Sequence, residues 1–79
     1  MTPIPHPQVQ SEWARNAAAL MRLATTQRRL ALRARRLAEN AETAEDAKLY
    51  RAEARRLWDA AKWHMAQARD NRTLAMRKH

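Results

Sequence analysis

The feature that most limits how this chain can fold is the absence of glycine, together with the confinement of proline to its first seven residues. The 79-residue sequence contains no Gly, and its three prolines are Pro3, Pro5 and Pro7. Tight β-hairpins depend on residues that tolerate positive φ, above all glycine, so a sheet built from hairpins is disfavoured. No strong helix breaker follows Pro7. We therefore expect an all-α protein.

The first segment is predicted to differ from the rest. Residues 1–10 alternate proline with other residue types, a pattern that favours an extended polyproline II conformation, so we expect a Pro-rich extended N-terminal arm. Ser11 is a good N-cap, and Glu12 would then lie in the first turn, where the helix dipole favours an anion. The sequence predicts a first helix over about residues 11–39.

A turn is predicted between two long helices. Asn40 can adopt the left-handed conformation that often ends a helix. Thr43 and Asp46 resemble a capping box in which Asp replaces Glu or Gln. The second helix is predicted over about residues 44–76. Because no Gly or Pro stands at the break, one continuous long helix is the alternative.

Both predicted helices carry a seven-residue repeat. In the first helix, the a positions are Trp13, Leu20, Gln27 and Ala34, the d positions are Leu23, Leu30 and Leu37, and the e positions are Ala17, Ala24, Ala31 and Ala38. In the second helix, alanine recurs at Ala47, Ala54, Ala61, Ala68 and Ala75. Such a repeat is typical of helices packed in a bundle, and the alanine rows indicate a close approach. Residues 11–79 are thus predicted to form an antiparallel helical hairpin.

The apolar inventory is small for an isolated subunit. Half of the residues counted as hydrophobic are alanine, which buries little more than a methyl group. Several large side chains also lie beside or outside the predicted seam, and these are Leu32, Leu49, Trp58 and Trp63. We predict that the hairpin forms a homodimer, a four-helix bundle, with these four residues at the interface. Alternatively, the N-terminal arm, another protein or a stacked base covers these side chains.

The sequence shows no catalytic or metal-binding constellation. The absence of Cys excludes disulfides and thiolate ligands. His6, His64 and His79 are not spaced as a zinc motif, and a chain without Gly has no Gly-rich phosphate-binding loop. We therefore expect no enzyme activity, no cofactor, no metal and no small-molecule substrate. No apolar run reaches membrane-spanning length, so we expect a cytoplasmic protein with no membrane contact.

The charge distribution is the strongest indication of function. The formal net charge is +8, and the acidic residues cluster at the predicted turn while arginines and lysines follow both helices in rows. Such rows attract phosphate backbones through counterion release. The predicted nucleic-acid-binding residues are Arg28, Arg29, Arg33, Arg35, Arg36, Lys48, Arg55, Lys62 and Arg69. The alternative is a solvated face that keeps an alanine-rich helix soluble.

Two functional hypotheses follow. The first is a small nucleic-acid-binding accessory or regulatory module without sequence-specific readout, because the overlong helices do not form a helix-turn-helix motif. The second is an adaptor or inhibitor of the kind with which phages and plasmids modulate a host protein. It would bind an acidic protein surface through Trp63, Leu49 and neighbouring arginines.

Overall fold

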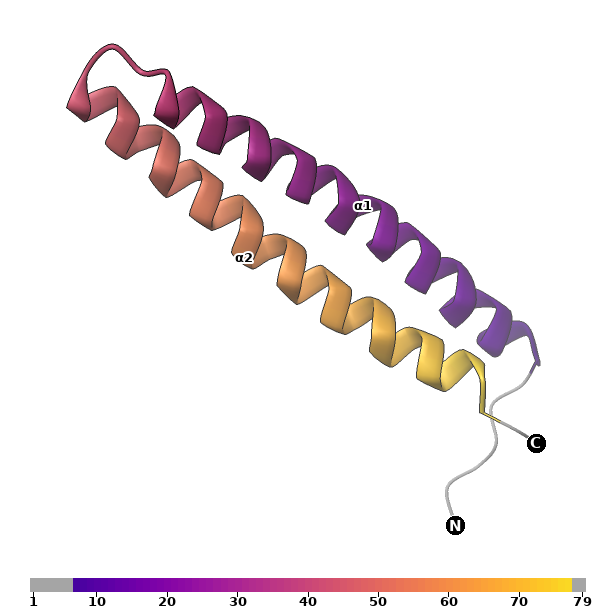
Figure 1. Ribbon diagram of the computed structural model, residues 1–79. Helices are drawn as coiled ribbons and strands as arrows, with labels where there is room; N and C mark the ends of the chain where they lie inside the picture. The colour runs from indigo at the N-terminus through magenta and orange to yellow at the C-terminus, as the bar shows by residue number, and fades with distance from the viewer. Residues whose placement is uncertain (1–6, 78–79) are drawn as a thin grey trace.

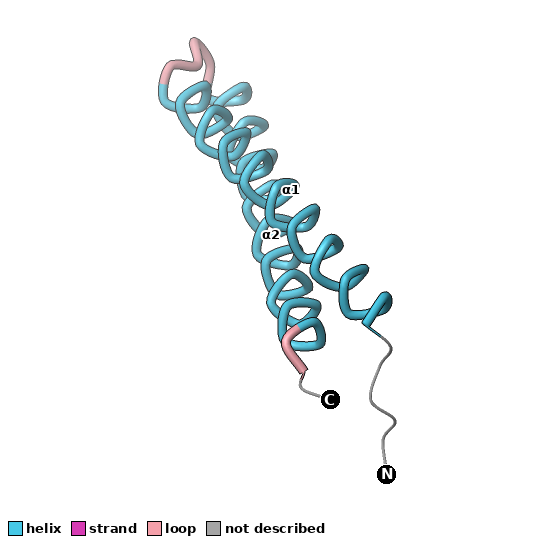
Figure 2. The backbone as a smooth tube through the Cα atoms, turned by 90° about the vertical axis from the view of Figure 1, so that its right-hand side faces the viewer, coloured by secondary structure: helices cyan, strands magenta, loops and turns pink. Residues whose placement is uncertain are grey.

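The protein folds as a helical hairpin. A computed structural model describes residues 7–77 and contains two α-helices, α1 (Pro7–Glu39) and α2 (Ala44–Ala75). The helices run antiparallel and side by side, with the loop at one end of the molecule (Figure 1). The view from the side shows a single narrow layer (Figure 2), with Cα extents of 59 × 20 × 12 Å. The predicted all-α hairpin is confirmed.

The start of α1 differs from the prediction. The helix begins at Pro7, so Ser11 is not its N-cap, and the predicted arm over residues 1–10 is wrong from residue 7 onward. Proline fits the first helical position because its fixed φ is helical and its missing N–H would have no partner there. The rest of the predicted arm, residues 1–6, lies outside the described residues.

The break between the helices falls where the sequence predicts it, and the caps explain why. Thr43 is the N-cap of α2, with extended backbone angles (φ −122°, ψ 151°) and a side-chain oxygen that accepts a hydrogen bond from the Asp46 N–H at 3.0 Å. Glu45 and Asp46 lie in the first turn of α2, where carboxylates stabilise the helix N-terminus. One continuous helix is therefore excluded. The C-cap of α2 is Met76, which agrees with the predicted end.

The predicted role of Asn40 is wrong. No residue in the described part of the chain has positive φ, so Asn40 is not left-handed. Instead, its N–H donates to Arg36 O at 3.1 Å and the Ala41 N–H donates to Ala38 O at 3.4 Å. The second of these bonds spans three residues and tightens the final turn of α1, which satisfies carbonyls that a left-handed residue would otherwise help to cap.

The two helices meet through alanine. The residues that are between 0 and 8 % exposed are Ala17, Ala24, Ala31 and Ala34 of α1 and Ala47, Ala54, Ala61 and Ala68 of α2. We call these eight residues the alanine seam. Among the described residues no larger side chain is buried to this degree. Because the separation of packed helices depends on the side chains between them, methyl groups allow a close approach, as the heptad rows predict.

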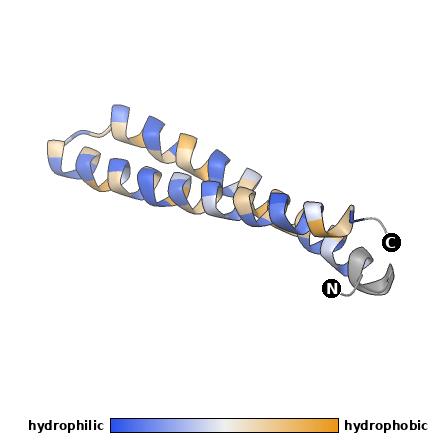
Figure 3. Ribbon diagram, turned by 90° about the horizontal axis from the view of Figure 1, so that it is seen from below, coloured by the Kyte–Doolittle hydropathy of each residue, from blue (hydrophilic) through white to orange (hydrophobic). Residues whose placement is uncertain are grey.

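Several larger apolar side chains lie beside the seam and remain partly exposed. The d-position residues Leu23, Leu30 and Leu37 are 43 to 44 % exposed, although they follow the heptad pattern of a buried row. Hydrophilic and hydrophobic residues alternate along both helices (Figure 3). The hairpin alone therefore leaves much of its apolar surface in contact with water.

Candidate nucleic-acid interface

The seam divides the hairpin into two faces by a simple rule. At 100° per residue, the residues three and four positions after a seam alanine lie about 60° to one side and 40° to the other side of it. In α2, the residues three positions after a seam alanine are Tyr50, Leu57, His64 and Asn71. The residues four positions after a seam alanine are Arg51, Trp58, Met65 and Arg72. In α1, Arg28 and Arg35 lie four positions after a seam alanine and Leu20 lies three positions after one. Leu23 and Leu30 lie one position before a seam alanine, about 100° to the same side as Leu20.

One face is apolar. We define the leucine face as Leu20, Leu23, Leu30 and Leu37 of α1 with Tyr50, Leu57 and His64 of α2. Both helices line a shallow groove of about 370 Å³ that includes Leu30, Tyr50 and Leu57. A second groove, of about 340 Å³, includes Leu20 and Leu23. Both helices contribute residues to each of the two grooves.

An exposed ion pair lies at the border of this face. Arg56 Nε donates to Glu53 Oε2 at 3.0 Å, and a second guanidinium nitrogen donates to Oε1. The hydrogen bonds from Arg56 lower the pKa of the Glu53 carboxyl, and Glu53 raises the pKa of Arg56. Because both side chains are exposed, this pair contributes little to stability.

A polar contact joins the helices on the leucine face. His64 Nδ1 lies 2.8 Å from Gln27 Oε1, a hydrogen bond in which the ring N–H donates to the amide oxygen. The Trp63 ring meets the His64 ring edge-on, with centroids 5.1 Å apart and an interplanar angle of 84°. Trp63 therefore contacts the leucine face from the outer side of α2.

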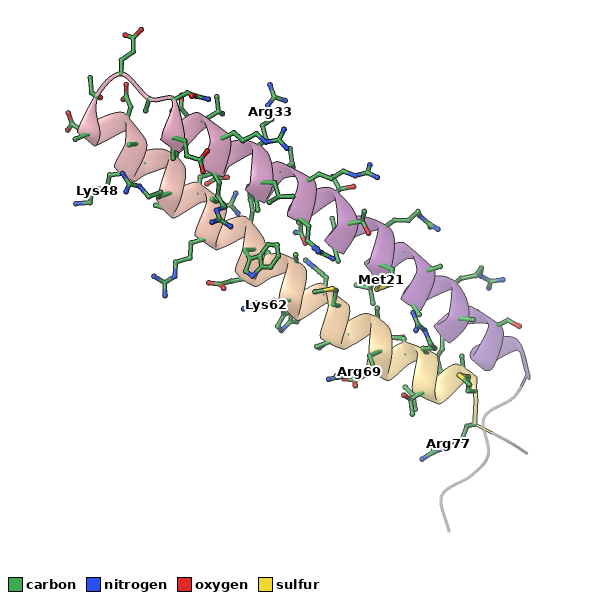
Figure 4. All side chains as sticks on the ribbon, in the orientation of Figure 1. Met21, Arg33, Lys48, Lys62, Arg69 and Arg77 are labelled. Atoms are coloured by element: carbon green, nitrogen blue, oxygen red, sulfur yellow. The ribbon has the colours of Figure 1, made fainter. Side chains whose placement is uncertain are left out.

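The opposite face is basic. We define the basic face as Arg28 and Arg35 of α1 with Lys48, Arg51, Arg55, Lys62, Arg69 and Arg72 of α2. Figure 4 shows Lys48, Lys62 and Arg69 along the edge of α2 that is farther from α1. In α2, no Asp or Glu stands one or four positions after a seam alanine. The basic residues of α2 thus form two rows without an intervening carboxylate.

The centre of the basic face is a cleft beside Trp58. This cleft has a volume of about 250 Å³ and is lined by Ala31, Arg35, Arg51, Ala54, Arg55 and Trp58. Arg28 Cζ lies 5.4 Å from the centroid of the Trp58 ring, within the range of a cation–π contact. A second cleft, of about 260 Å³, shares Arg35 and Arg51 and ends at Glu39. Three arginines therefore line the same cleft as Trp58, and a fourth, Arg28, lies over its ring.

The structure brings together six of the nine predicted nucleic-acid-binding residues. Arg28, Arg35, Lys48, Arg55, Lys62 and Arg69 belong to the basic face. Arg29 and Arg36 lie five positions after a seam alanine, on the outer surface of α1. Arg33 lines the groove of the leucine face with Leu30 and Leu37 and points away from α2 in Figure 4.

Two residues of the basic face were missed by sequence reasoning. Arg51 and Arg72 fall outside the seven-residue rows of Lys and Arg that the prediction used. The signal that identifies them is their position, four residues after Ala47 and Ala68. Arg51 is also fixed locally, because its Nε donates to Ala47 O at 3.4 Å.

The four predicted interface residues do not form one surface. Trp58 and Trp63 are five residues apart and point about 140° away from each other around α2. Leu32 lies one residue after a seam alanine, at the edge of the basic face. Leu49 and Trp63 lie on the outer side of α2 and are 65 % and 60 % exposed.

No family model, curated protein or solved structure matches this chain. Neither helix within residues 7–77 has a stretch that is long and apolar enough to cross a membrane. The same residues contain no group of three or more His, Cys, Asp or Glu side chains placed to hold a metal ion. The function is therefore inferred from the two faces of the hairpin.

Proposed function

We propose that the protein binds nucleic acid through its basic face, as a non-enzymatic accessory or regulatory module. The observation that carries this proposal is the gathering of eight Lys and Arg side chains on one side of the alanine seam. A surface of this kind displaces the counterions that surround a phosphate backbone, and this release drives binding without regard to sequence. The chemistry of a guanidinium cluster also fits phosphate oxygens, which it can bind through two parallel hydrogen bonds.

Sequence-tolerant binding is the mode that the shape supports. The two helices lie against each other in one layer, and neither projects from the hairpin as a separate recognition helix (Figure 2). Proteins that read the major groove present such a helix to the base edges. Phosphate contacts position a protein on nucleic acid but carry no sequence information by themselves.

We further propose that a second copy covers the leucine face and completes a four-helix bundle. Leu30 and Leu37 are over 40 % exposed, and the same groove includes Tyr50 and Leu57 from the other helix. The charge distribution selects this face, because two basic faces would repel each other while the leucine faces carry few charges. In such a dimer both basic faces remain on the outside, where each can contact phosphates.

A salt titration tests nucleic-acid binding. The double variant Arg35→Gln, Arg51→Gln removes two charges from the centre of the basic face, and the matched variant Arg22→Gln, Arg29→Gln removes two from the outer surface of α1. On duplex DNA the first variant should flatten the log–log salt dependence by up to about 0.9 per lost phosphate contact, while the control should change it little. Absence of binding at about 50 mM salt, or equal effects of both variants, would contradict the proposal.

Sedimentation equilibrium tests the dimer. Leu30 and Leu32 offer a matched pair, because they are 44 % and 45 % exposed but lie on different sides of α1. Leu30→Lys should shift the protein from dimer to monomer in the micromolar range, whereas Leu32→Lys should leave it dimeric. A wild-type protein that sediments as a folded monomer throughout this range would rule the dimer out.

The second candidate function is a protein-binding adaptor or inhibitor. The exposed Trp63 and Leu49 on the outer side of α2 favour it, because aromatic side chains at interfaces often dominate the binding energy. A pull-down from nuclease-treated lysate separates the two candidates. One protein retained in stoichiometric amount, and lost when Trp63 is replaced by Ala, would favour the adaptor over the nucleic-acid-binding module.

A further inference from the structure

The basic face contains an aromatic ring that phosphate binding does not use. Trp58 lines the cleft and is 36 % exposed, although a purely electrostatic surface needs only cations. The floor of this cleft is apolar, since it includes the seam residues Ala31 and Ala54. The cleft therefore combines a flat ring, an apolar floor and a rim of arginines.

The arginines of the rim are available to a ligand. Within residues 7–77, no carboxylate forms an ion pair with Arg28, Arg35, Arg51 or Arg55. Arg28 lies over the Trp58 ring, and Arg51 is held by Ala47 O. Two of these cations are thus placed by contacts that leave guanidinium N–H groups for an anion.

We infer that this cleft binds an unpaired base together with the phosphates on either side of it, so that the protein prefers single-stranded over duplex nucleic acid. The inference rests on the proposed nucleic-acid binding and names the form of nucleic acid that this site takes. Single strands bind where a cationic groove holds the backbone and an aromatic ring stacks on a base. In a duplex the bases are stacked and paired within the helix, so Trp58 has no base to contact.

The size and surroundings of the cleft support this ligand. Its volume of about 250 Å³ is below the roughly 300–1,000 Å³ of pockets that enclose a drug-sized molecule. A base delivered by a polymer needs less enclosure, because neighbouring phosphates add contacts outside the cleft. Lys48 and Lys62 extend the cationic surface along α2 on both sides of Arg55, seven residues apart and so about 10 Å from it. A strand that places one base on Trp58 can therefore continue along this row.

Fluorescence of Trp58 tests the contact directly. The full-length variant Trp13→Phe, Trp63→Phe retains Trp58 as its single tryptophan. A 15-nucleotide oligo(dT) or oligo(U) should quench its emission on binding, whereas an abasic strand with the same number of phosphates should quench it much less. The DNA and RNA strands share the base and phosphate chemistry, and their relative affinities show which of the two is preferred.

Affinity measurements on a second variant complete the test. Trp58→Leu keeps an apolar side chain but removes the stacking surface, and Trp63→Leu is its matched control outside the cleft. Trp58→Leu should weaken binding of the single strand about five- to hundred-fold. It should leave duplex affinity nearly unchanged, and the control should change neither. Circular dichroism shows whether each variant remains helical.

The outcomes separate this inference from the function on which it rests. Equal loss of single-strand and duplex binding in Trp58→Leu, or tight single-strand binding without quenching of Trp58, would overturn the inference and leave phosphate binding intact. Failure of the wild-type protein to bind either form would overturn both. Selective loss of single-strand binding, together with base-dependent quenching, would support both.

Discussion

The imidazole of His64 on α2 is hydrogen-bonded to the side-chain amide of Gln27 on α1, with Nδ1 and Oε1 2.8 Å apart. This contact crosses a seam whose buried residues are all alanine. Alanine rows alone would pack almost as well after a shift of seven residues, because every heptad presents the same methyl group. A polar pair at one position makes such a shift unfavourable and so helps to fix the register of the two helices.

A double-mutant cycle measures this contact. Gln27→Ala and His64→Ala should each destabilise the protein, and the loss in the double variant should differ from the total of the single losses by about 0.5–1.5 kcal/mol, the net contribution of a hydrogen bond. The measurement is the free energy of unfolding in urea. Thr25→Ala combined with His64→Ala is the control, because Thr25 bonds to Met21 O within its own helix. Additive effects within about 0.5 kcal/mol for Gln27 and His64 would show that the pair is uncoupled.

Enlarging a seam residue should separate the helices. Ala61 is 1 % exposed and Ala52 is exposed on the outer side of α2, so the two alanines differ in burial within one helix. Ala61→Leu should cost about 1–3 kcal/mol, the range for overpacking a well-packed site, and Ala52→Leu should cost much less. Urea denaturation followed by circular dichroism gives both values. Similar losses in the two variants would show that the seam is not closely packed.

The N-cap of α2 should contribute measurably to stability. Thr43→Ala removes the hydroxyl that accepts from the Asp46 N–H, and the expected loss is about 1 kcal/mol. Thr26→Ala is the control because Thr26 Oγ1 donates to Arg22 O in the middle of α1. There, replacement by Ala should be neutral or stabilising, since Ala has the higher helix propensity. A neutral effect of Thr43→Ala would mean that water caps the helix equally well.

Salt should stabilise the folded protein. The basic face concentrates like charges, and mobile ions screen their repulsion over about 10 Å at 0.1 M ionic strength. Raising NaCl from about 20 to 200 mM should increase the Tm by a few degrees, and the increase should be smaller in the Arg35→Gln, Arg51→Gln variant. Thermal denaturation at several protein concentrations separates this effect from dimerisation. A Tm that falls with salt would contradict it.

The helices of the hairpin could be predicted because their signals are local. The alanine repeat and the Thr43 cap define α2 in the sequence, and the structure ends this helix within one residue of the prediction. The start of α1 could not be placed in the same way. Proline is compatible both with an extended arm and with the first position of a helix, so Pro7 alone does not distinguish the two.

The candidate site was predicted only in part, because it depends on how two helices meet. A spacing of seven residues identifies side chains on the same side of one helix, and this spacing placed Lys48, Arg55, Lys62 and Arg69 together. The sequence could not show that Arg28 and Arg51 share a face. That conclusion requires knowing which seam alanines of α1 pack against which seam alanines of α2. The assignment of Trp58 and Trp63 to one interface has a different origin, because their spacing of five residues along a single helix already separates them by about 140°.

The alanine seam also makes the two sides of the hairpin chemically independent. Its side chains end at Cβ, so none of them reaches from one face to the other, and a change on either face meets the opposite one only through backbone. Residues of the leucine face can thus be altered without contacting those of the basic face. The hairpin therefore has an apolar side and a basic side that meet only at the seam, and the residues of one side can change while those of the other are kept.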